Sequence, residues 1–318
     1  MSALLEVQGL TVGYATPGGV VEAVRDVGFS LDRGEILGLV GESGSGKSTL
    51  VKGMLRTLAP PGVVVGGHVV LDGHALLELE EEPLRRLRWR TASIVPQSAL
   101  NAFNPLLTVG AQIADTILAH ESVAPSAVRA RAEGLLKLVD IDPVHVDSYP
   151  HQLSGGMRQR AALALAMALS PPLVVMDEPT TALDVVVERQ ILRRVLELQQ
   201  EHGFAIVFIT HDIALLLEFA TRLGVMYSGR LVELGPTQGF RDGGTHPYTE
   251  GLLNALPPAI SEDREPISIP GSAPRLTDPP SGCRFHPRCP LADARCSTEA
   301  PPFEARATGD HLVACWHR

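Results

Sequence analysis

The sequence predicts an α/β fold in which helices cover a largely parallel sheet. Three short apolar runs, at 35–40, 173–176 and 205–210, have the composition of buried strands. Patterns of helical spacing follow two of these runs, at 47–58 and 185–202, and strands that alternate with helices indicate a parallel sheet. The chain has 318 residues, 45% of them hydrophobic, which is enough for about two domains that each bury a core.

The elements before and within the long middle region continue this alternation. The first 12 residues alternate roughly between apolar and polar side chains, which predicts a strand. Residues 63–73 and 91–96 indicate further strands. Residues 105–150 indicate helices with polar faces that are broken at prolines, and 154–169 indicates a helix rich in small residues.

The last third of the chain changes in composition. A helix is expected at 212–221, followed by a hairpin of two strands around Ser228 and Gly229. From about residue 236 onward prolines are frequent, and one helix is expected at 246–256. The rest has too few periodic apolar residues for an independent core, so we expect a loop-rich C-terminal extension at 236–318.

Charge and hydropathy restrict the partners of the chain. It carries 27 basic and 36 acidic residues, a net charge of −9, without lysine or arginine runs, which argues against binding nucleic acid or a basic membrane anchor. The longest apolar run, 161–169, is about half of the ~18–20 residues that a membrane span needs. The N-terminal segment lacks a secretory signal pattern. We therefore expect a cytoplasmic protein that meets a membrane only through partners.

A glycine-rich segment, Gly41–Ser48, fits the pattern G-x-x-x-x-G-K-[ST] between an expected strand and an expected helix. Its backbone N–H groups can surround phosphate oxygens, aided by the positive end of the helix dipole. Lys47, one of three lysines in the chain, would reach the β- and γ-phosphates, and the Ser48 hydroxyl would bind Mg²⁺. The alternative is a flexible Gly/Ser turn that precedes a lysine by chance.

Two carboxylates follow the apolar run at 173–176. Asp177 at the end of this strand can hold Mg²⁺ through water beside the phosphates. Glu178 can orient or deprotonate the attacking water as a general base. The alternative is an acidic cap that begins the next turn.

A second candidate anion site lies at Ser154, Gly155 and Gly156. Ser154 is a good N-cap, and the two glycines expose backbone N–H groups at the start of a helix. A simple capped helix is the alternative. One nucleotide should not need two helix N-termini from one subunit, so the duplication indicates a site shared between two subunits.

Taken in order, these motifs resemble the nucleotide-binding subunit of ATP-binding cassette (ABC) transporters. LSGGMRQR, at 153–160, resembles the family signature, which is more specific than a phosphate loop. The resemblance covers roughly residues 3–235. The other matched motifs are an adenine-stacking aromatic at Tyr14, the Q-loop at Gln97, the D-loop at 181–184 with Asp184, and the switch histidine at His211.

The resemblance implies a P-loop NTPase (RecA-like) ABC nucleotide-binding domain at 1–235. This domain would have an N-terminal antiparallel β-subdomain and an inserted helical subdomain at about 98–165. Two cassettes would face head to tail, so that Ser154, Gly155 and Gly156 of one subunit close over the ATP of the other. The residues implied to bind the subunit's own ATP are Tyr14, Gly41, Ser43, Gly44, Gly46, Lys47, Ser48 and Thr49.

Three side chains are implied to act on the attacking water. Glu178 is the base, His211 contacts the γ-phosphate and positions the water, and Gln97 contacts Mg²⁺ and the water. Gln97 also reports phosphate occupancy to the helical subdomain. Without the resemblance, His211 would be better explained as a capping residue beside Asp212. Gln97 would then be an ordinary loop glutamine as readily as a ligand, and Tyr14 a partly buried strand aromatic.

The C-terminal part narrows the resemblance. Residues 245–249 (THPYT) and 282–290 resemble the extension on the ATPases of oligopeptide and dipeptide importers. Within that group the sequence resembles the D-type subunit, which implies an F-type ATPase subunit as heterodimer partner. Two membrane permeases, whose coupling helices meet a groove near Gln97, and an extracytoplasmic solute-binding protein are implied as well. The location implied is the cytoplasmic face of the inner (plasma) membrane.

The four cysteines, Cys283, Cys289, Cys296 and Cys315, all lie in the extension, with spacing C-x5-C-x6-C-x18-C. This is not the paired spacing of a zinc ribbon, and a cytoplasmic chain favours a metal over disulfides. Four thiolates suit zinc or an iron–sulfur cluster, and the resemblance implies a [4Fe–4S] cluster that ties the extension together. Free thiols are a third explanation. His286, His311 and His317 lie nearby as substitute ligands or as surface histidines.

The resulting hypothesis is the ATP-hydrolysing subunit of a peptide importer. Members of the same family also import nickel, so the solute is open. An exporter ATPase is the nearest rival, but it would not carry the HPYT segment. Two hypotheses come from different functional classes: a non-transport ABC ATPase acting on the ribosome or DNA, and a metal or redox sensor built on the cysteines.

Overall fold

The computed structural model describes residues 3–180, 183–256, 267–305 and 309–318. The N-terminal part forms an antiparallel sheet of four strands in the order β2-β1-β4-β5. These strands are β1 (Leu5–Thr16), β2 (Gly19–Leu31), β4 (Gly62–Leu71) and β5 (His74–Ala75). The N-terminal antiparallel subdomain is thus confirmed, and β2 is a strand that the sequence pattern did not predict.

The second sheet has eight strands in the order β11-β12-β10-β9-β3-β8-β7-β6. Its centre is parallel from β9 through β3, β8 and β7 to β6, which confirms the predicted class. The remaining strands run antiparallel at one edge. The strands are β3 (Ile36–Val40), β6 (Ala92–Val95), β7 (Leu173–Asp177), β8 (Ala205–Ile209), β9 (Arg222–Tyr227), β10 (Arg230–Pro236), β11 (Glu304–Ala305) and β12 (Leu312–Val313).

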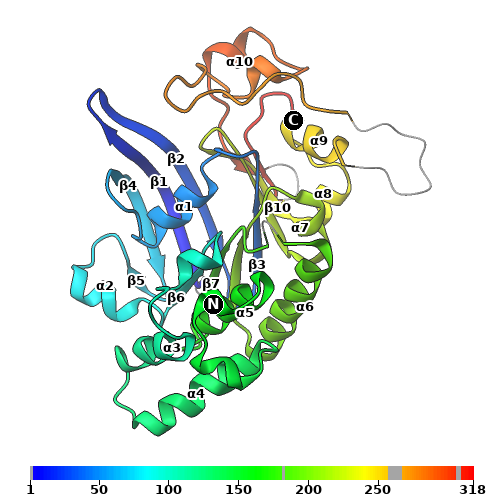
Figure 1. Cartoon of the computed structure of the whole chain (residues 1–318). Coiled ribbons are helices and arrows are strands. Elements are labelled where there is room, and N and C mark those ends of the chain that lie inside the picture. Colours follow the sequence, from blue (N-terminus) through cyan, green and yellow to red (C-terminus); the bar gives the residue numbers. More distant parts are fainter. Residues whose placement is uncertain (1–2, 181–182, 257–266, 306–308) are drawn as a thin grey trace.

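Each face of the parallel sheet buries its own hydrophobic core, because successive strand residues point to opposite faces. On β7, Val174 and Met176 join one core and Leu173 and Val175 the other. Helices α5 (Gly155–Ala166), α6 (Val185–His202) and α7 (Ile213–Phe219) cover the first face. Helices α1 (Lys47–Met54) and α2 (Glu81–Leu87) and the antiparallel sheet cover the second (Figure 1). The helix expected at 47–58 is α1, which ends earlier than expected, at Met54.

A helical segment is inserted between β6 and β7. It contains η1 (Ala99–Ala102), α3 (Val109–Leu118), α4 (Pro125–Leu138), η2 (Pro143–Asp147) and η3 (Pro150–Gln152), and it leads into α5. The prolines that break the helical pattern begin new helical turns, where their missing N–H is not needed. This confirms the predicted helices of the middle region.

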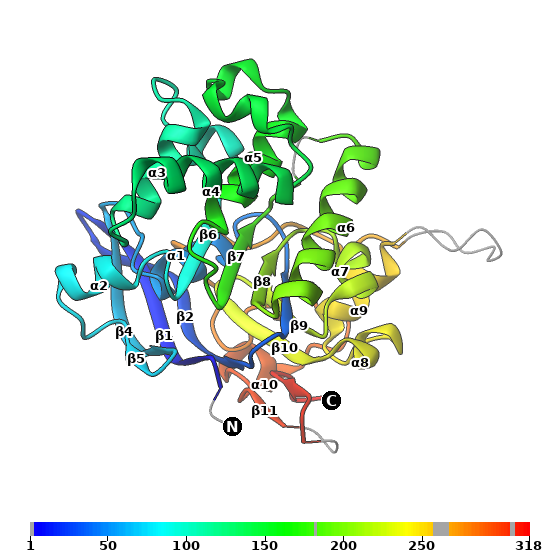
Figure 2. The ribbon, with the colours of Figure 1, turned by 90° about the horizontal axis from the view of Figure 1, so that it is seen from below.

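The C-terminal extension lies at the end of the molecule opposite α3 and α4 (Figure 2). Its helical elements are α8 (Thr237–Arg241), α9 (Pro247–Asn254), η4 (His286–Arg288) and α10 (Ala294–Thr298). Tyr248 and Phe285 belong to the core of the main domain, and β12 pairs with β10. The extension is therefore packed onto the central sheet by its aromatic residues.

None of the helices in the described part of the chain has the length and apolar character that a membrane span requires.

Candidate nucleotide site

The phosphate loop lies between β3 and α1, in the turn that the sequence predicts. A Cβ atom on Gly41 would lie 2.1 Å from the carbonyl oxygen of Met226. Gly46 has φ 103°, and a Cβ there would lie 2.6 Å from the carbonyl oxygen of Ala23. Only glycine fits these two positions, because the neighbouring strands approach the loop so closely.

Lys47 begins α1, and its ammonium is folded back over the loop. The Nζ atom donates to the carbonyl oxygens of Gly41 at 2.7 Å and Glu42 at 3.1 Å. The residue is 4% exposed. Burial lowers the pKa of Lys47, while the surrounding carboxylates act in the opposite direction. The loop's own carbonyl groups therefore hold the Lys47 side chain in the lining of the cavity where phosphates are expected to bind.

Ser48 and Asp177 form the second part of the site. The Ser48 hydroxyl donates to Asp177 Oδ1 at 2.7 Å, although 129 residues separate them in sequence. Asp177 is 5% exposed at the end of β7, and burial raises its pKa while the bond from Ser48 lowers it in part. A buried carboxylate beside a hydroxyl offers two hard oxygen ligands, so these residues fit Mg²⁺.

Glu178, Gln97 and His211 lie close together. Gln97 donates through Nε2 to Glu178 Oε2 at 2.8 Å, and His211 Nδ1 lies 4.0 Å from the same oxygen. Glu178 has a left-handed backbone with φ 47°, and its N–H donates to the carbonyl oxygen of Ile209 at 2.9 Å. The next residue, Asp212, caps α7 by accepting a hydrogen bond from the Leu215 N–H at 3.1 Å, so His211 lies beside this cap as well as beside Glu178.

Lys47, Ser48, Gln97 and Glu178 line one cavity of about 280 Å³, whereas Asp177 and His211 are not part of its lining. Tyr14 forms part of its wall, and its hydroxyl lies 3.0 Å from Thr49 Oγ1. Val21, Ala23 and Leu276 also line it, and no motif pointed to them. The full lining is Tyr14, Val21, Ala23, Ser43, Gly44, Ser45, Gly46, Lys47, Ser48, Thr49, Gln97, Glu178 and Leu276.

The signature residues do not belong to this lining. Ser154 is the N-cap of α5 and accepts a hydrogen bond from the N–H of Met157 at 3.3 Å. Ser154 and Gly155 are exposed, and a Cβ on Gly156 would lie 2.7 Å from Val187. Asp184 caps α6 in the same way, while residues 181–182 of the expected D-loop lie outside the described part of the chain. An exposed helix start of this kind is open to a second molecule.

The four cysteines converge in the extension, and all four are thiols. Cys296 and Cys315 are buried, and the Cys283 N–H donates to the Cys296 carbonyl oxygen at 2.8 Å. Burial, together with the negative charge of the other three sulfurs, raises the pKa of Cys283 to about 11. A metal centre held by these four residues would therefore have to supply the positive charge that stabilises their deprotonated form.

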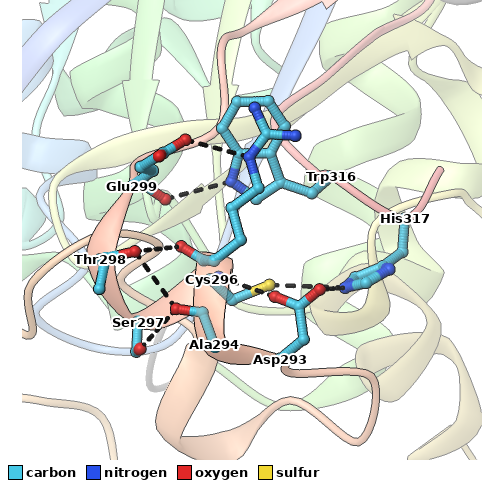
Figure 3. A network of polar contacts seen from close by, with 9 residues as sticks. Asp293, Ala294, Cys296, Ser297, Thr298, Glu299, Trp316 and His317 are labelled. Atoms are coloured by element: carbon cyan, nitrogen blue, oxygen red, sulfur yellow. Dashed lines mark hydrogen bonds and ion pairs between the residues drawn. The ribbon is translucent and has the colours of Figure 1, made fainter.

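The histidines near the cysteines differ in their surroundings. His317 Nε2 lies 3.5 Å from Cys296 Sγ and 3.4 Å from the Asp293 carboxylate (Figure 3). Among the described residues, the ligand atoms of Asp293, Cys296 and His317 form a group within 4.8 Å of one another. His286 bonds to the Cys283 carbonyl oxygen at 2.9 Å. His311 is only partly exposed, and its Nε2 lies 2.7 Å from the buried carboxylate of Glu233.

Comparison with known proteins gives matches to both parts of the chain. The family model described as ABC transporter matches residues 24–181, and that of the oligopeptide/dipeptide transporter C-terminal region matches residues 232–296. The dipeptide transport ATP-binding protein DppD of Caldanaerobacter subterraneus is 39% identical over 99% of this chain and 97% of its own length. The oligopeptide transport ATP-binding protein OppD of Bacillus subtilis is 39% identical over 99% of this chain and 89% of its own. The solved ATP-binding cassette MJ0796, bound to ADP and Pi, is 27% identical with TM-score 0.66, over 73% of this chain and 98% of that one.

An ATP-binding cassette is thus the class of protein that the fold and the cavity define. Its ligands are expected to be ATP and Mg²⁺. Similarity to DppD and OppD along nearly the whole chain defines the family more narrowly than the fold does. The chain belongs to the family of ABC transporter ATP-binding proteins that carry the oligopeptide/dipeptide transporter C-terminal region, and it is an ABC-type ATPase.

Proposed function

We propose that this chain is the ATP-hydrolysing subunit of a peptide importer. The observation that carries the proposal is that Lys47, Gln97 and Glu178 line one cavity. The same chain carries the C-terminal region of oligopeptide/dipeptide transporters. The relatives are named as dipeptide and oligopeptide transport proteins, which supports peptides as the solute. Nickel or another solute is the alternative within this family.

In this proposal the loop residues bind ATP through backbone N–H groups and Lys47 neutralises the terminal phosphates. Tyr14 stacks on adenine, and Glu178 takes the proton of the attacking water, which Gln97 and His211 orient. Ser48, Asp177 and Gln97 would hold Mg²⁺, which would neutralise developing charge on the phosphates. The proposed ATP ligands are Tyr14, Gly41, Ser43, Gly44, Gly46, Lys47, Ser48 and Thr49.

The signature residues act on a partner subunit in this proposal. Ser154, Gly155 and Gly156 would close over the partner's ATP with their helix N-terminus, and Asp184 would lie at the interface between the subunits. The exposure of Ser154, Gly155 and Asp184, and the absence of all four residues from the lining of this chain's own cavity, support such a role. The related cassette MJ0796 is described as dimeric, which supports the same arrangement.

The assembly we propose contains an F-type ATPase subunit as heterodimer partner and two membrane permeases. An extracytoplasmic solute-binding protein would deliver the solute, and this chain would lie on the cytoplasmic face of the plasma membrane. Co-purification with the products of neighbouring permease genes, followed by transport assays with labelled peptides and nickel, tests both the partners and the solute.

The base assignment is tested by Glu178→Gln. This variant keeps the hydrogen-bonding shape of the side chain but cannot accept the proton, so hydrolysis in the assembled transporter should fall about 100-fold or more while ATP still binds. Glu197→Gln, which alters an exposed carboxylate on α6, is the matched control and should hydrolyse ATP normally. Near-normal turnover by Glu178→Gln would refute the assignment.

For the cysteines we propose a [4Fe–4S] cluster held by Cys283, Cys289, Cys296 and Cys315. In tetrahedral zinc sites the sulfurs lie about 3.8 Å apart, since each Zn–S bond is about 2.3 Å. Among the described residues, the four sulfurs do not form a group within 4.8 Å of one another, so the structure does not have the sulfur arrangement of a tetrahedral zinc site. The centre would tie together an extension that lacks a core of its own.

Elemental analysis distinguishes the two centres. Protein purified without oxygen should be brown and contain about four irons per chain, each cluster being held by four thiolates. Cys296→Ser should lose most of this iron, whereas Ser297→Ala, one residue further, should keep it. Stoichiometric zinc without iron would reject the cluster in favour of the zinc alternative.

A further inference from the structure

The C-terminal extension reaches back to the phosphate loop of the nucleotide site. Arg288 follows the proline of η4, and its two terminal nitrogens donate to the two carboxylate oxygens of Glu42, each at 3.0 Å. Glu42 is the second residue of the phosphate loop. The two residues are 246 positions apart in sequence, so only the tertiary fold brings them together. A planar guanidinium and a carboxylate in this bidentate arrangement form a strong and directional pair.

Arg288 is fixed on its other sides as well. Its Nε donates to the carbonyl oxygen of Pro270 at 2.8 Å, and Nη1 lies 3.3 Å from the hydroxyl of Tyr227. The guanidinium also lies over the Tyr227 ring, 5.7 Å from its centre. The residue is only 9% exposed. Its position is therefore set by the extension and by β9 together, and Glu42 is held at a defined place.

A second contact from the extension holds the backbone of the same loop residue. The Glu42 N–H donates to the hydroxyl of Tyr248 at 2.9 Å. Tyr248, from α9, is fully buried, and its ring packs against Tyr227 at 4.6 Å and against Phe285 at 5.4 Å between ring centres. Side chain and backbone of Glu42 are thus both held from outside the main domain.

Holding Glu42 also sets the position of Lys47. The Glu42 carbonyl oxygen accepts a hydrogen bond from Lys47 Nζ at 3.1 Å. A shift of the Glu42 backbone would therefore also shift the Lys47 ammonium. Leu276, also from the extension, forms part of the cavity wall beside Gly44 and Ser45. A neighbouring cavity between residues 273–277 and the loop shows that this segment lies over the loop.

We propose that Arg288 and Tyr248 are positioning residues of the phosphate loop, so that the C-terminal extension is part of the nucleotide site. A glycine-rich loop loses conformational freedom when it closes around phosphates, and fixing it beforehand raises affinity. The inference rests on the proposed function, because it takes this loop to be the site of ATP. It assigns the extension a task at the ATP site in addition to carrying the cysteines.

The test is ATP affinity in the intact transporter, measured by equilibrium binding of a fluorescent ATP analogue. Arg288→Ala should weaken binding about tenfold, within the range that a misplaced binding group costs, with kcat at saturation changed much less. Glu42→Ala should have the same effect, and the double variant should be no weaker than either single one. Arg288→Lys should restore part of the affinity. Tyr248→Phe removes one hydroxyl and should weaken binding about threefold.

Controls separate this inference from the proposed function and from misfolding. Arg295→Ala removes an exposed ion pair of the same extension, with Glu299, and should bind ATP normally. Lys47→Ala should lose binding, and retained binding there would refute the nucleotide site itself. If Lys47→Ala fails to bind while folded Arg288→Ala and Tyr248→Phe bind ATP like the wild type, the positioning role is wrong. Additive effects of Arg288→Ala and Glu42→Ala would likewise show that the two act separately.

Discussion

At the scale of single residues, His246 shows how the extension depends on one protonation state. It is 1% exposed, and its Nδ1 accepts a hydrogen bond from the Tyr248 N–H at 3.0 Å, which caps α9. The His246 N–H donates to Glu233 at 2.9 Å. Burial lowers the pKa of His246 from 6.5 to about 4, against the opposing effect of the Glu233 carboxylate. The folded protein therefore keeps His246 neutral, so that its Nδ1 can accept the hydrogen bond from the Tyr248 N–H.

This depressed pKa predicts acid sensitivity. Between pH 6.5 and about 4 the unfolded chain binds more protons at His246 than the folded chain, so the free energy of unfolding falls as pH falls. The full shift corresponds to about 3 kcal/mol. His246→Asn keeps an acceptor for the cap but does not titrate, so its melting temperature should fall less steeply over this range. Parallel pH profiles of the melting temperature for the two proteins would contradict the assignment.

Glu233 contributes a second acid-sensitive step lower on the pH scale. It is fully buried, and burial alone would raise its pKa, but the hydrogen bond from His311 and its other partners bring the pKa below the usual 4.5. A lowered carboxylate pKa stabilises the fold above pH 4.5, and that stability is lost as pH falls below it. Both residues lie where the extension joins the central sheet, so acid should weaken this junction.

The residues of the site differ in how far the sequence could predict them. Lys47, Asp177 and Glu178 follow strands in recognisable patterns, and the structure places them around one loop. Gln97 and His211 needed the family resemblance, because a lone glutamine or histidine has no diagnostic spacing. Arg288 could not be predicted as a partner of the loop, since its contact depends on the path of the whole extension.

At the scale of elements, the start of α5 allows a structural role to be separated from a functional one. Ser154 caps α5 by accepting from Met157, and Thr108 caps α3 by accepting from the Ala111 N–H at 3.2 Å. Loss of either cap should cost about 1 kcal/mol of stability. The two helices therefore provide a matched pair of capping residues, of which only one carries the signature motif.

We expect Ser154→Ala and Thr108→Ala to lower the melting temperature by similar amounts. Only Ser154→Ala should also reduce ATP hydrolysis by the assembled transporter, by about tenfold or more, because a hydrogen-bond donor to the partner's ATP is lost. Hydrolysis and melting temperature measured on the same preparations check this. Equal loss of hydrolysis in both variants would indicate that Ser154 acts only as a cap.

The elements themselves were predicted to the extent that their signals are local. The expected helix at 185–202 is α6 (Val185–His202), because an amphipathic pattern, the Asp184 cap and Gly203 define both of its ends. The long strand β2 was missed because polar and charged residues interrupt its apolar positions. Strands β11 and β12 have two residues each and exist only through pairing at the sheet edge, which no local pattern reveals.

At the scale of the whole molecule, the inserted helices and the C-terminal extension make different contacts with the nucleotide site. The inserted helices α3 and α4 lie at one end and the extension at the other, with the phosphate loop on the sheet between them (Figure 2). Gln97 follows β6, where the inserted helices begin, and bonds to Glu178. We expect movement of the helical segment to change the position of the proposed base through this bond, whereas the extension contacts the phosphate loop at Glu42.

The central claim is that ATP hydrolysis by this chain drives peptide import, and uptake into proteoliposomes containing the complete transporter tests it most directly. With wild-type protein, labelled peptide should accumulate only when ATP is supplied on the side of this subunit. The same complex carrying Glu178→Gln should accumulate none, and Glu197→Gln should behave as the wild type. Peptide uptake that is independent of ATP, or ATP-driven accumulation of nickel without peptide, would contradict the account.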